Sequence, residues 1–172
     1  GIVTPGYFDT FETPILNGRE FTSFDTPVGQ PVAIVNESFA RVHFEGQDPI
    51  GRQFKRIRPG GREPWLTVIG LVPDMLMQGI GNNNASPVGY YIPIAQSDVA
   101  NGVRIAVRTR GEPAALAPQV RAAVADLDPD LAIWDVSALR HVIDRQTWFY
   151  TSFGTFFMAF GICALLLAAA GL

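Results

Sequence analysis

Ser38 is the residue whose local setting most resembles a catalytic one. In the stretch VNESFA it follows a predicted strand and opens a predicted helix, as the nucleophile of a hydrolase does. The glycines that permit the sharp turn of G-x-S-x-G are missing, because Asn36 and Ala40 occupy those positions. His43 and His141, the only histidines, are far apart in the sequence and have no acidic residue at metal-ligand spacing. We therefore interpret this stretch as a capped helix, and keep a hydrolase using Ser38 and His43 only as a third hypothesis.

The acidic and glycine-rich motifs do not indicate a metal or nucleotide site. Asp126, Asp128, Asp130 and Asp135 are spaced somewhat like a calcium loop, but Pro129 interrupts them and the glycine and final glutamate of an EF-hand are absent. The sequence RPGGREP lacks the lysine and helix that a phosphate-binding loop needs, and indicates a hairpin turn instead. The single cysteine excludes an internal disulfide and a cysteine-based zinc site. The sequence predicts no cofactor, no metal and no enzymatic activity.

The strongest local charge is a basic stretch, RQFKRIRPGGR, which contains no acidic residue. It has two interpretations: a solvated strand face and turn, or a contact surface for an acidic partner domain or for lipid headgroups. A nucleic-acid partner is not expected, because the formal net charge of the chain is −3. The candidate interaction residues are Arg52, Lys55, Arg56, Arg58 and Arg62.

The elements that must position these residues follow from hydrophobic periodicity and turn signals. Together they predict an α+β fold without repeats. We expect a helix capped by Thr4 with Pro5 in its first turn; a buried strand at 32–35 running into a helix that Asn36 caps and Gly46 ends; strands at 52–57, 65–72 and 90–94; a loop at 79–89; a half-buried strand at 103–110; an amphipathic helix at 112–127; a strand at 132–136; and a helix capped by Ser137.

The end of the chain is uncharged from Gln146 to Leu172. A helix of about 20 apolar residues is long enough to span the hydrocarbon core of a bilayer. Large apolar side chains in FGTFFMAFGICALLLAAAGL point all round the predicted helix, and small residues between them suit close helix packing in lipid. The alternatives are a buried core helix and a helix at a dimer interface. The pattern favours a transmembrane helix.

The sequence gives no turn signal between the helix capped by Ser137 and the apolar run. We therefore predict an α+β domain at 1–136, a stalk helix at 137–150 and a transmembrane helix at 151–172. Trp148 and Tyr150 stand where an interfacial aromatic belt would lie, and Arg140 and Arg145 flank the near side of the span.

Several motifs occur in an order that resembles the MacB-like periplasmic domains of FtsX/MacB-type ABC transporter permeases. The resemblance extends from Val3 to Leu172 and rests on five segments with similar spacing. They are VTPGYFDTFETPILNGREF, PVAIVNESFARVHFEGQDPIGRQF, WLTVIGLVPD, YYIPIAQ and AVRTRGEPAALAPQVRAAVADLDPDLAIWDVSALRHVIDRQ.

The resemblance implies a fold and a function. The fold would be a mixed sheet with βαβ-type units, and the chain would be the back portion of a domain lying between the first two of four spans. Such permeases sit in the bacterial inner membrane with this domain on the periplasmic side, dimerise or pair with another permease, and couple to a cytoplasmic ABC ATPase. They transmit ATP-driven motion to the outer domain, which has no catalytic residues. The stalk at 137–150 would lead into the second span.

A binding module is the alternative function. In this hypothesis the tail anchors the domain to a membrane, and a cleft near the loop GIGNNNASPVG holds a small ligand or peptide. The same tail serves both hypotheses, so anchoring does not separate them.

Overall fold

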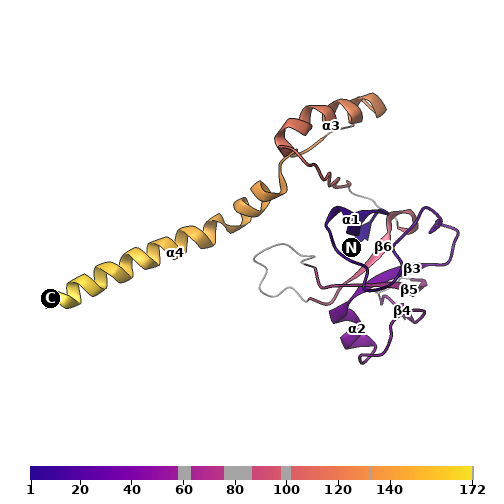
Figure 1. Ribbon diagram of the computed structural model, residues 1–172, viewed down its shortest axis with the longest axis horizontal. Helices are drawn as coiled ribbons and strands as arrows, with labels where there is room; N and C mark the ends of the chain where they lie inside the picture. The colour runs from indigo at the N-terminus through magenta and orange to yellow at the C-terminus, as the bar shows by residue number, and fades with distance from the viewer. Residues whose placement is uncertain (58–62, 76–86, 98–101, 132, 172) are drawn as a thin grey trace. The chain divides into compact units, whose positions relative to one another are not determined.

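The computed structural model describes residues 1–57, 63–75, 87–97, 102–131 and 133–171, with the side chains of 144–152 and 163 left out. These residues form two compact units (Figure 1). The first unit reaches Arg108, and the second begins at Thr109.

The first unit is built on a six-stranded mixed sheet, which confirms the predicted α+β class and mixed strand directions. The order along the sheet is β1-β6-β3-β5-β2, and β4 also pairs with β5. Three pairs are antiparallel (β2–β5, β3–β6 and β4–β5), while β1–β6 and β3–β5 are parallel. The strands are β1 (Ile2–Val3), β2 (Asn17–Gly18), β3 (Val32–Asn36), β4 (Gln53–Lys55), β5 (Trp65–Val72) and β6 (Tyr90–Pro93).

The central strands β3 and β5 make a βαβ-type unit with helix α2 (Glu37–His43) between them. Asn36 ends β3 and caps α2, because its side-chain oxygen accepts a hydrogen bond from the Phe39 N–H. The predicted cap is therefore confirmed. The predicted cap of the first helix is wrong: α1 (Tyr7–Thr10) starts after Gly6, which has a φ of 80° that glycine adopts without strain.

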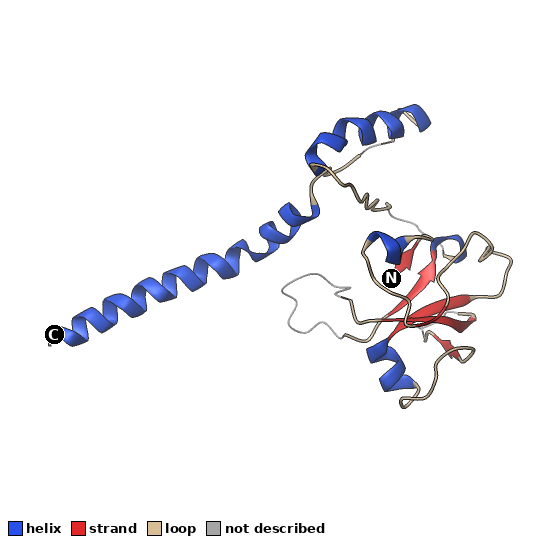
Figure 2. Ribbon diagram, viewed as in Figure 1, coloured by secondary structure: helices blue, strands red, loops and turns tan. Residues whose placement is uncertain are grey.

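Helices α1 and α2 lie on opposite faces of the sheet (Figure 2). On the α1 face, the ring of Phe8 packs with Ile34 and Tyr91, and all three are buried. On the α2 face, Phe39 packs with Val35, which neighbours Ile34 along β3 and points the other way. Because β3 is buried on both faces, it reads in the sequence as a continuous apolar run and not as an alternating one.

Two glycines, Gly18 and Gly70, allow the backbones of β2 and β5 to pair closely. Gly18 pairs with Gly70, and a Cβ added to Gly18 would lie 2.2 Å from the carbonyl oxygen of Ile69. Gly18 also has a φ of 79°, which non-glycine residues seldom adopt. The turn signal Asn17-Gly18 therefore marks a place where two backbones approach closely.

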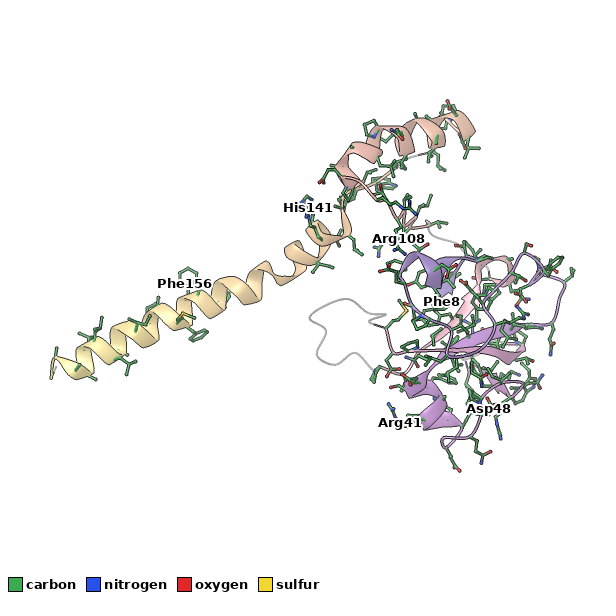
Figure 3. The ribbon with its side chains drawn as sticks, in the orientation of Figure 1. Phe8, Arg41, Asp48, Arg108, His141 and Phe156 are labelled. Carbon is green, nitrogen blue, oxygen red and sulfur yellow. The ribbon has the colours of Figure 1, made fainter. Side chains whose placement is uncertain are left out.

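The second unit contains α3 (Pro113–Leu127) and α4 (Leu139–Ala169). Helix α4 is continuous, as expected from the missing turn signal, but it starts after Ala138, so the predicted Ser137 cap is wrong. Its large apolar side chains are exposed, among them Phe156, which projects from the helix in Figure 3. Within the described part of the chain, no helix combines the length and the hydropathy needed to cross a membrane.

Two predicted strands are absent from the described residues. Residues 103–110 and 133–136 belong to no strand. Val103, Ile105 and Val107, expected to be half-buried, are 62%, 72% and 53% exposed. A segment with alternating apolar residues forms a strand only when another strand lies beside it to share backbone hydrogen bonds. No described strand lies beside either segment.

Candidate interaction site

An open hollow of about 360 Å³ lies on the α2 face of the sheet. Its described lining comes from α2 and the residue after it, from β4 and the residue after it, and from the start of β6. No aspartate or glutamate is among these residues, which are Phe39, His43, Phe44, Gln53, Phe54, Lys55, Arg56 and Tyr90. The lining of the hollow is therefore largely aromatic and includes two basic residues, Lys55 and Arg56.

The aromatic walls are rings from three separate elements that contact one another. The Phe54 ring centroid lies 4.8 Å from that of Phe39 and 5.2 Å from that of Tyr90, and Phe39 is 4.4 Å from the His43 ring. Phe54 and Tyr90 come from strands on either side of the β3–β5 pair, and both pack against the buried cluster of Ala33, Leu66 and Ile92. Ala33, the smallest member of this cluster, is 0% exposed.

Asn36 fixes the wall of the hollow formed by α2. Besides capping the helix, its side-chain oxygen accepts from the N–H of Gly89 at 3.0 Å, and its side-chain nitrogen donates to the carbonyl of Pro87. Asn36 is 0% exposed, so all three bonds are made away from bulk water. One buried amide thus joins α2 to the segment that leads into β6.

Ser38 belongs to a second contact that holds α2. Its hydroxyl donates to the Asp74 carboxylate at 2.5 Å and accepts from the Arg41 guanidinium at 2.6 Å, while its N–H donates to the other Asp74 oxygen. Figure 3 shows Arg41 on α2. These bonds engage Ser38 with Asp74 and Arg41, whereas His43 packs against Phe39. The hydrolase hypothesis required Ser38 and His43 to act together, and the described contacts do not bring them together.

The structure gives the described residues of the basic stretch different surroundings. Arg52 donates to the Asp48 carbonyl and to the Gln47 side chain, both on the loop before β4 (Asp48 is labelled in Figure 3). Arg56 forms an ion pair with Glu63 at 2.6 Å, across the hairpin. Lys55 is exposed at the end of β4 and lines the hollow. Arg58 and Arg62 lie outside the described residues, as does most of the loop at 79–89.

The candidate membrane-proximal residues are only partly described. Arg140 lies 3.9 Å from Glu112 in an ion pair whose side chains are 70% and 64% exposed, so solvent screens it strongly. The side chains of Arg145, Trp148 and Tyr150 lie outside the described part of the structure. Among the described residues, no three His, Cys, Asp or Glu side chains lie close enough together to hold a metal ion.

The surroundings of two titratable groups in the first unit, Tyr91 and Asp25, shift their pKa values. Burial, together with the charges of Tyr7 and Asp74, raises the pKa of Tyr91 to about 12. The Tyr91 hydroxyl is buried and has no hydrogen-bond partner among the described atoms. The hydrogen bond from Arg19 lowers the pKa of Asp25, and the N–H and hydroxyl of Thr22 lower it further.

The hollow is not evident from the amino-acid sequence. Phe39 and His43 are four residues apart and share a helix face, which is a local signal. Phe54 and Tyr90, however, are 36 positions apart in the numbering, and their contact depends on the strand order. A single sequence does not encode that order in any periodicity.

Comparisons with known proteins agree with the resemblance found in the sequence. Residues 1–127 match the family described as the MacB-like periplasmic core domain. A search of curated protein sequences found no match.

Solved structures were also compared. The periplasmic region of MacB from Actinobacillus actinomycetemcomitans is 18% identical, with a TM-score of 0.54; the alignment covers 82% of this chain and 63% of that one. The extracellular domain of the noncanonic ABC-type transporter YknZ from Gram-positive bacteria is 24% identical, covering 54% of this chain and 41% of that one, with a TM-score of 0.39. A domain of a putative permease protein from Porphyromonas gingivalis is 15% identical, covering 81% and 56%, with a TM-score of 0.45.

The chain therefore spans less than two thirds of each of these structures. The likeness to the MacB region shows a shared fold, and the family match covers most of the sequence. This chain belongs to the family of MacB-like periplasmic core domains.

Proposed function

We propose that this chain is the extracytoplasmic domain of an ABC transporter permease in a bacterial inner membrane, and that it transmits ATP-driven motion without catalysing a reaction. Family membership and the MacB-like fold support the first part of the proposal. The single observation that carries the second part is the continuous helix α4, which links the charged and the uncharged parts of the second unit.

Helix α4 has the properties that a mechanical link requires. At about 1.5 Å per residue, its 31 residues extend about 46 Å. It contains no proline, and no break divides it between Leu139 and Ala169. Because sharp bends in helices arise at prolines, glycine pairs or bulges, a displacement of one end is passed to the other.

The C-terminal part of α4 is proposed to be a membrane span. Its exposed apolar residues include Phe153, Phe156, Phe160 and Leu165, and no charge follows Arg145. A helix that is apolar all round is stable in lipid or in a protein core. We propose residues 137–150 as the stalk and residues 151–172 as the span, in a permease that dimerises or pairs with another permease and couples to a cytoplasmic ABC ATPase.

Membrane insertion can be tested with the full chain and a version that lacks residues 147–172. We expect the full chain, expressed in bacteria, to stay in the membrane pellet after extraction at alkaline pH, and the shortened chain to be released. Cys163, the only cysteine, provides a second measurement. In intact membranes it should resist a membrane-impermeant maleimide and react once detergent is added. Release of the full chain by alkali would contradict the span.

Coupling can be tested in the parent permease reconstituted with its ATPase. Replacing Phe153 in the interior of α4 by proline costs about 3 kcal/mol of helix stability and kinks the helix, whereas alanine at the same position preserves it. We expect ATP to change amide hydrogen exchange in β3 in the wild type and the alanine variant, but not in the proline variant. ATP hydrolysis should continue in all three. An unchanged ATP response in the proline variant would refute transmission through α4.

The basic stretch is proposed as a surface for an acidic partner, with Arg52, Lys55, Arg56, Arg58 and Arg62 as its members. The described contacts reduce the number of basic residues that are available to a partner. Arg52 and Arg56 already bond within the first unit, so Lys55 is the described cation best able to meet a partner.

A further inference from the structure

We propose that the outer surface of β4 and the start of β5 binds a neutral glycan, with one pyranose ring stacked on the indole of Trp65. We call this surface the Trp65 face, and its members are Gln30, Gln53, Lys55, Trp65 and Thr67. The inference rests on the first unit alone and is independent of the proposed coupling function.

The strand register gathers four of these side chains on one side of the sheet. In the antiparallel β4–β5 pair, Lys55 lies opposite Trp65, and Gln53 lies opposite Thr67. Phe54 comes between Gln53 and Lys55 along β4, so its ring points to the other side of the sheet. Although Lys55 also borders the hollow, its side chain therefore leaves β4 beside Trp65 and away from the Phe54 ring.

Trp65 is the apolar part of this face. Thr67 pairs with Val32, a member of the cluster beneath α1, so the Trp65 face belongs to the α1 side of the sheet. Trp65 is nevertheless 58% exposed, whereas the next residue, Leu66, is 5% exposed on the other side. An exposed indole offers a flat apolar surface with a polar N–H at its edge. The C–H groups on one face of a pyranose with equatorial hydroxyls form a matching flat apolar patch.

Two amides are held on the same face as hydrogen-bond acceptors. The Thr67 hydroxyl accepts from Nε2 of Gln30 at 2.8 Å and from Nε2 of Gln53 at 3.1 Å. Both glutamines are exposed, and within the described part of the chain their Oε1 atoms accept no hydrogen bond. Sugar hydroxyls would therefore meet acceptors that are already oriented, so little binding free energy would be lost to ordering them.

A glycan fits this face better than a protein or a free small molecule does. Among the four paired residues only Trp65 is apolar, whereas the centre of a protein interface gathers several apolar and aromatic side chains. Small-molecule sites are concave, and the described hollow lies on the other side of the sheet. An open face lets a chain of sugars continue beyond the ring that is stacked.

The uncharged members of the face favour a neutral ligand. Lys55 is exposed, and an ammonium in that setting gains little from an ion pair, because solvent screens the charge. It can still donate a hydrogen bond to a sugar hydroxyl. The selective contacts are therefore those of the indole and the two amides.

Binding can be measured with the full chain in a zwitterionic detergent, because a detergent with a sugar headgroup would compete. With Trp134→Phe and Trp148→Phe in place, Trp65 is the only tryptophan, and its fluorescence reports on the face. The probe is cellotetraose, titrated to about 10 mM because small ligands at open sites bind in the millimolar range. Its matched controls are glycerol, which has hydroxyls but no ring, and cyclohexanol, which has a ring but a single hydroxyl.

We expect cellotetraose to change the Trp65 fluorescence saturably, and each control compound to act at least about tenfold more weakly, since each offers only one kind of contact. The affinity of variants is measured by saturation-transfer NMR on the glycan, which needs no tryptophan. Trp65→Ala should weaken binding at least about tenfold, because it removes the stacking surface. Gln53→Ala should weaken it about threefold or more, because it removes an acceptor.

Two further variants serve as controls. Trp134→Ala removes another exposed indole, 85% exposed and in the second unit, and should bind as the wild type does. Lys55→Gln should stay within about threefold of the wild type, because the charge contributes little. All of the substituted positions are exposed, and equal thermal midpoints will show that the variants are folded.

Equal effects of cyclohexanol and cellotetraose would overturn the proposal, because the indole would then be a general apolar surface. So would unchanged affinity in either Trp65→Ala or Gln53→Ala, or a larger loss in Lys55→Gln than in Trp65→Ala, which would reveal charge attraction. The absence of any response to cellotetraose would also overturn it. If shielding of Trp65 from acrylamide then rose with protein concentration, the face would be assigned to contact with a second copy of the chain.

Discussion

Replacing Asn36 by alanine should destabilise the first unit more than removing any other side-chain amide group of that unit. The substitution leaves the N–H groups of Phe39 and Gly89 and the carbonyl of Pro87 without their partner, at a site that is 0% exposed. Each such group costs about 1–3 kcal/mol. Taking the lower end for all three, the expected loss is about 3 kcal/mol, a large part of the 5–15 kcal/mol typical of a folded domain.

A serine variant separates the two roles of Asn36. Serine is as good a helix cap as asparagine, but its side chain is too short to bond with both Gly89 and Pro87 as well. The free energy of unfolding of Asn36→Ser should therefore lie between that of the wild type and that of Asn36→Ala. Asn17→Ala, at an exposed asparagine, is the matched control and should cost less than about 1 kcal/mol.

The assay is urea unfolding followed by tryptophan fluorescence in a Trp134→Phe, Trp148→Phe background. Trp65 of β5 is then the only tryptophan, and it reports on the sheet. A loss below about 1 kcal/mol in Asn36→Ala would refute the argument, because water would then be replacing the buried bonds. A serine variant as stable as the wild type would show that the bonds to Gly89 and Pro87 contribute nothing.

Three further outcomes are expected in the same assay. Gly18→Ala should cost more than about 2 kcal/mol, since its Cβ would meet the Ile69 carbonyl at 2.2 Å, whereas Gly46→Ala, with a similar φ and nothing within 4 Å, should cost only about 1 kcal/mol. Tyr91→Phe should leave stability unchanged or raise it by up to about 1 kcal/mol, because it removes a buried hydroxyl without a described partner; the wild type, with a Tyr91 pKa of about 12, should also lose more stability than the variant above pH 10. Asp25, whose pKa is lowered from 3.8, binds protons more readily in the unfolded chain, so its stabilisation is complete well above pH 3.8 and is lost as the pH falls below that value; the stability gap between the wild type and Asp25→Asn should close over this range.

The parts of the fold that sequence predicted correctly depend on local chemistry. The strand Val32–Asn36 is a continuous apolar run that ends in an asparagine, and both the strand and the cap follow from those residues alone. The strand Trp65–Val72 ends just before Pro73, where the sequence placed its end. The continuity of α4 also follows from a local fact, the absence of any breaking residue.

The errors arose where a residue's role depends on something distant in the sequence. Thr4 and Ser137 are good cap residues, yet Gly6 and Ala138 precede the helices, because propensity does not decide between neighbouring starts. Alternation at 103–110 shows that the segment could cover one face of a sheet, but not that a partner strand stands beside it. The sequence contains an acid just after the basic stretch, Glu63, but only the hairpin brings it to Arg56.

The dependence on strand order also explains why aromatic rings line the hollow. A local pattern tells where an apolar residue is, and the strand order decides whether it closes a core or lines a surface. Phe54 and Tyr90 lie on strands that β5 and β3 separate, and their rings contact each other because both pack against the buried cluster that contains Ala33. Substituting Ala33 by valine should therefore push these two rings apart. Because Ala33 is 0% exposed, the two added methyl groups should cost about 1–3 kcal/mol of the free energy of unfolding in the urea assay, and an unchanged value would show that the rings move without cost.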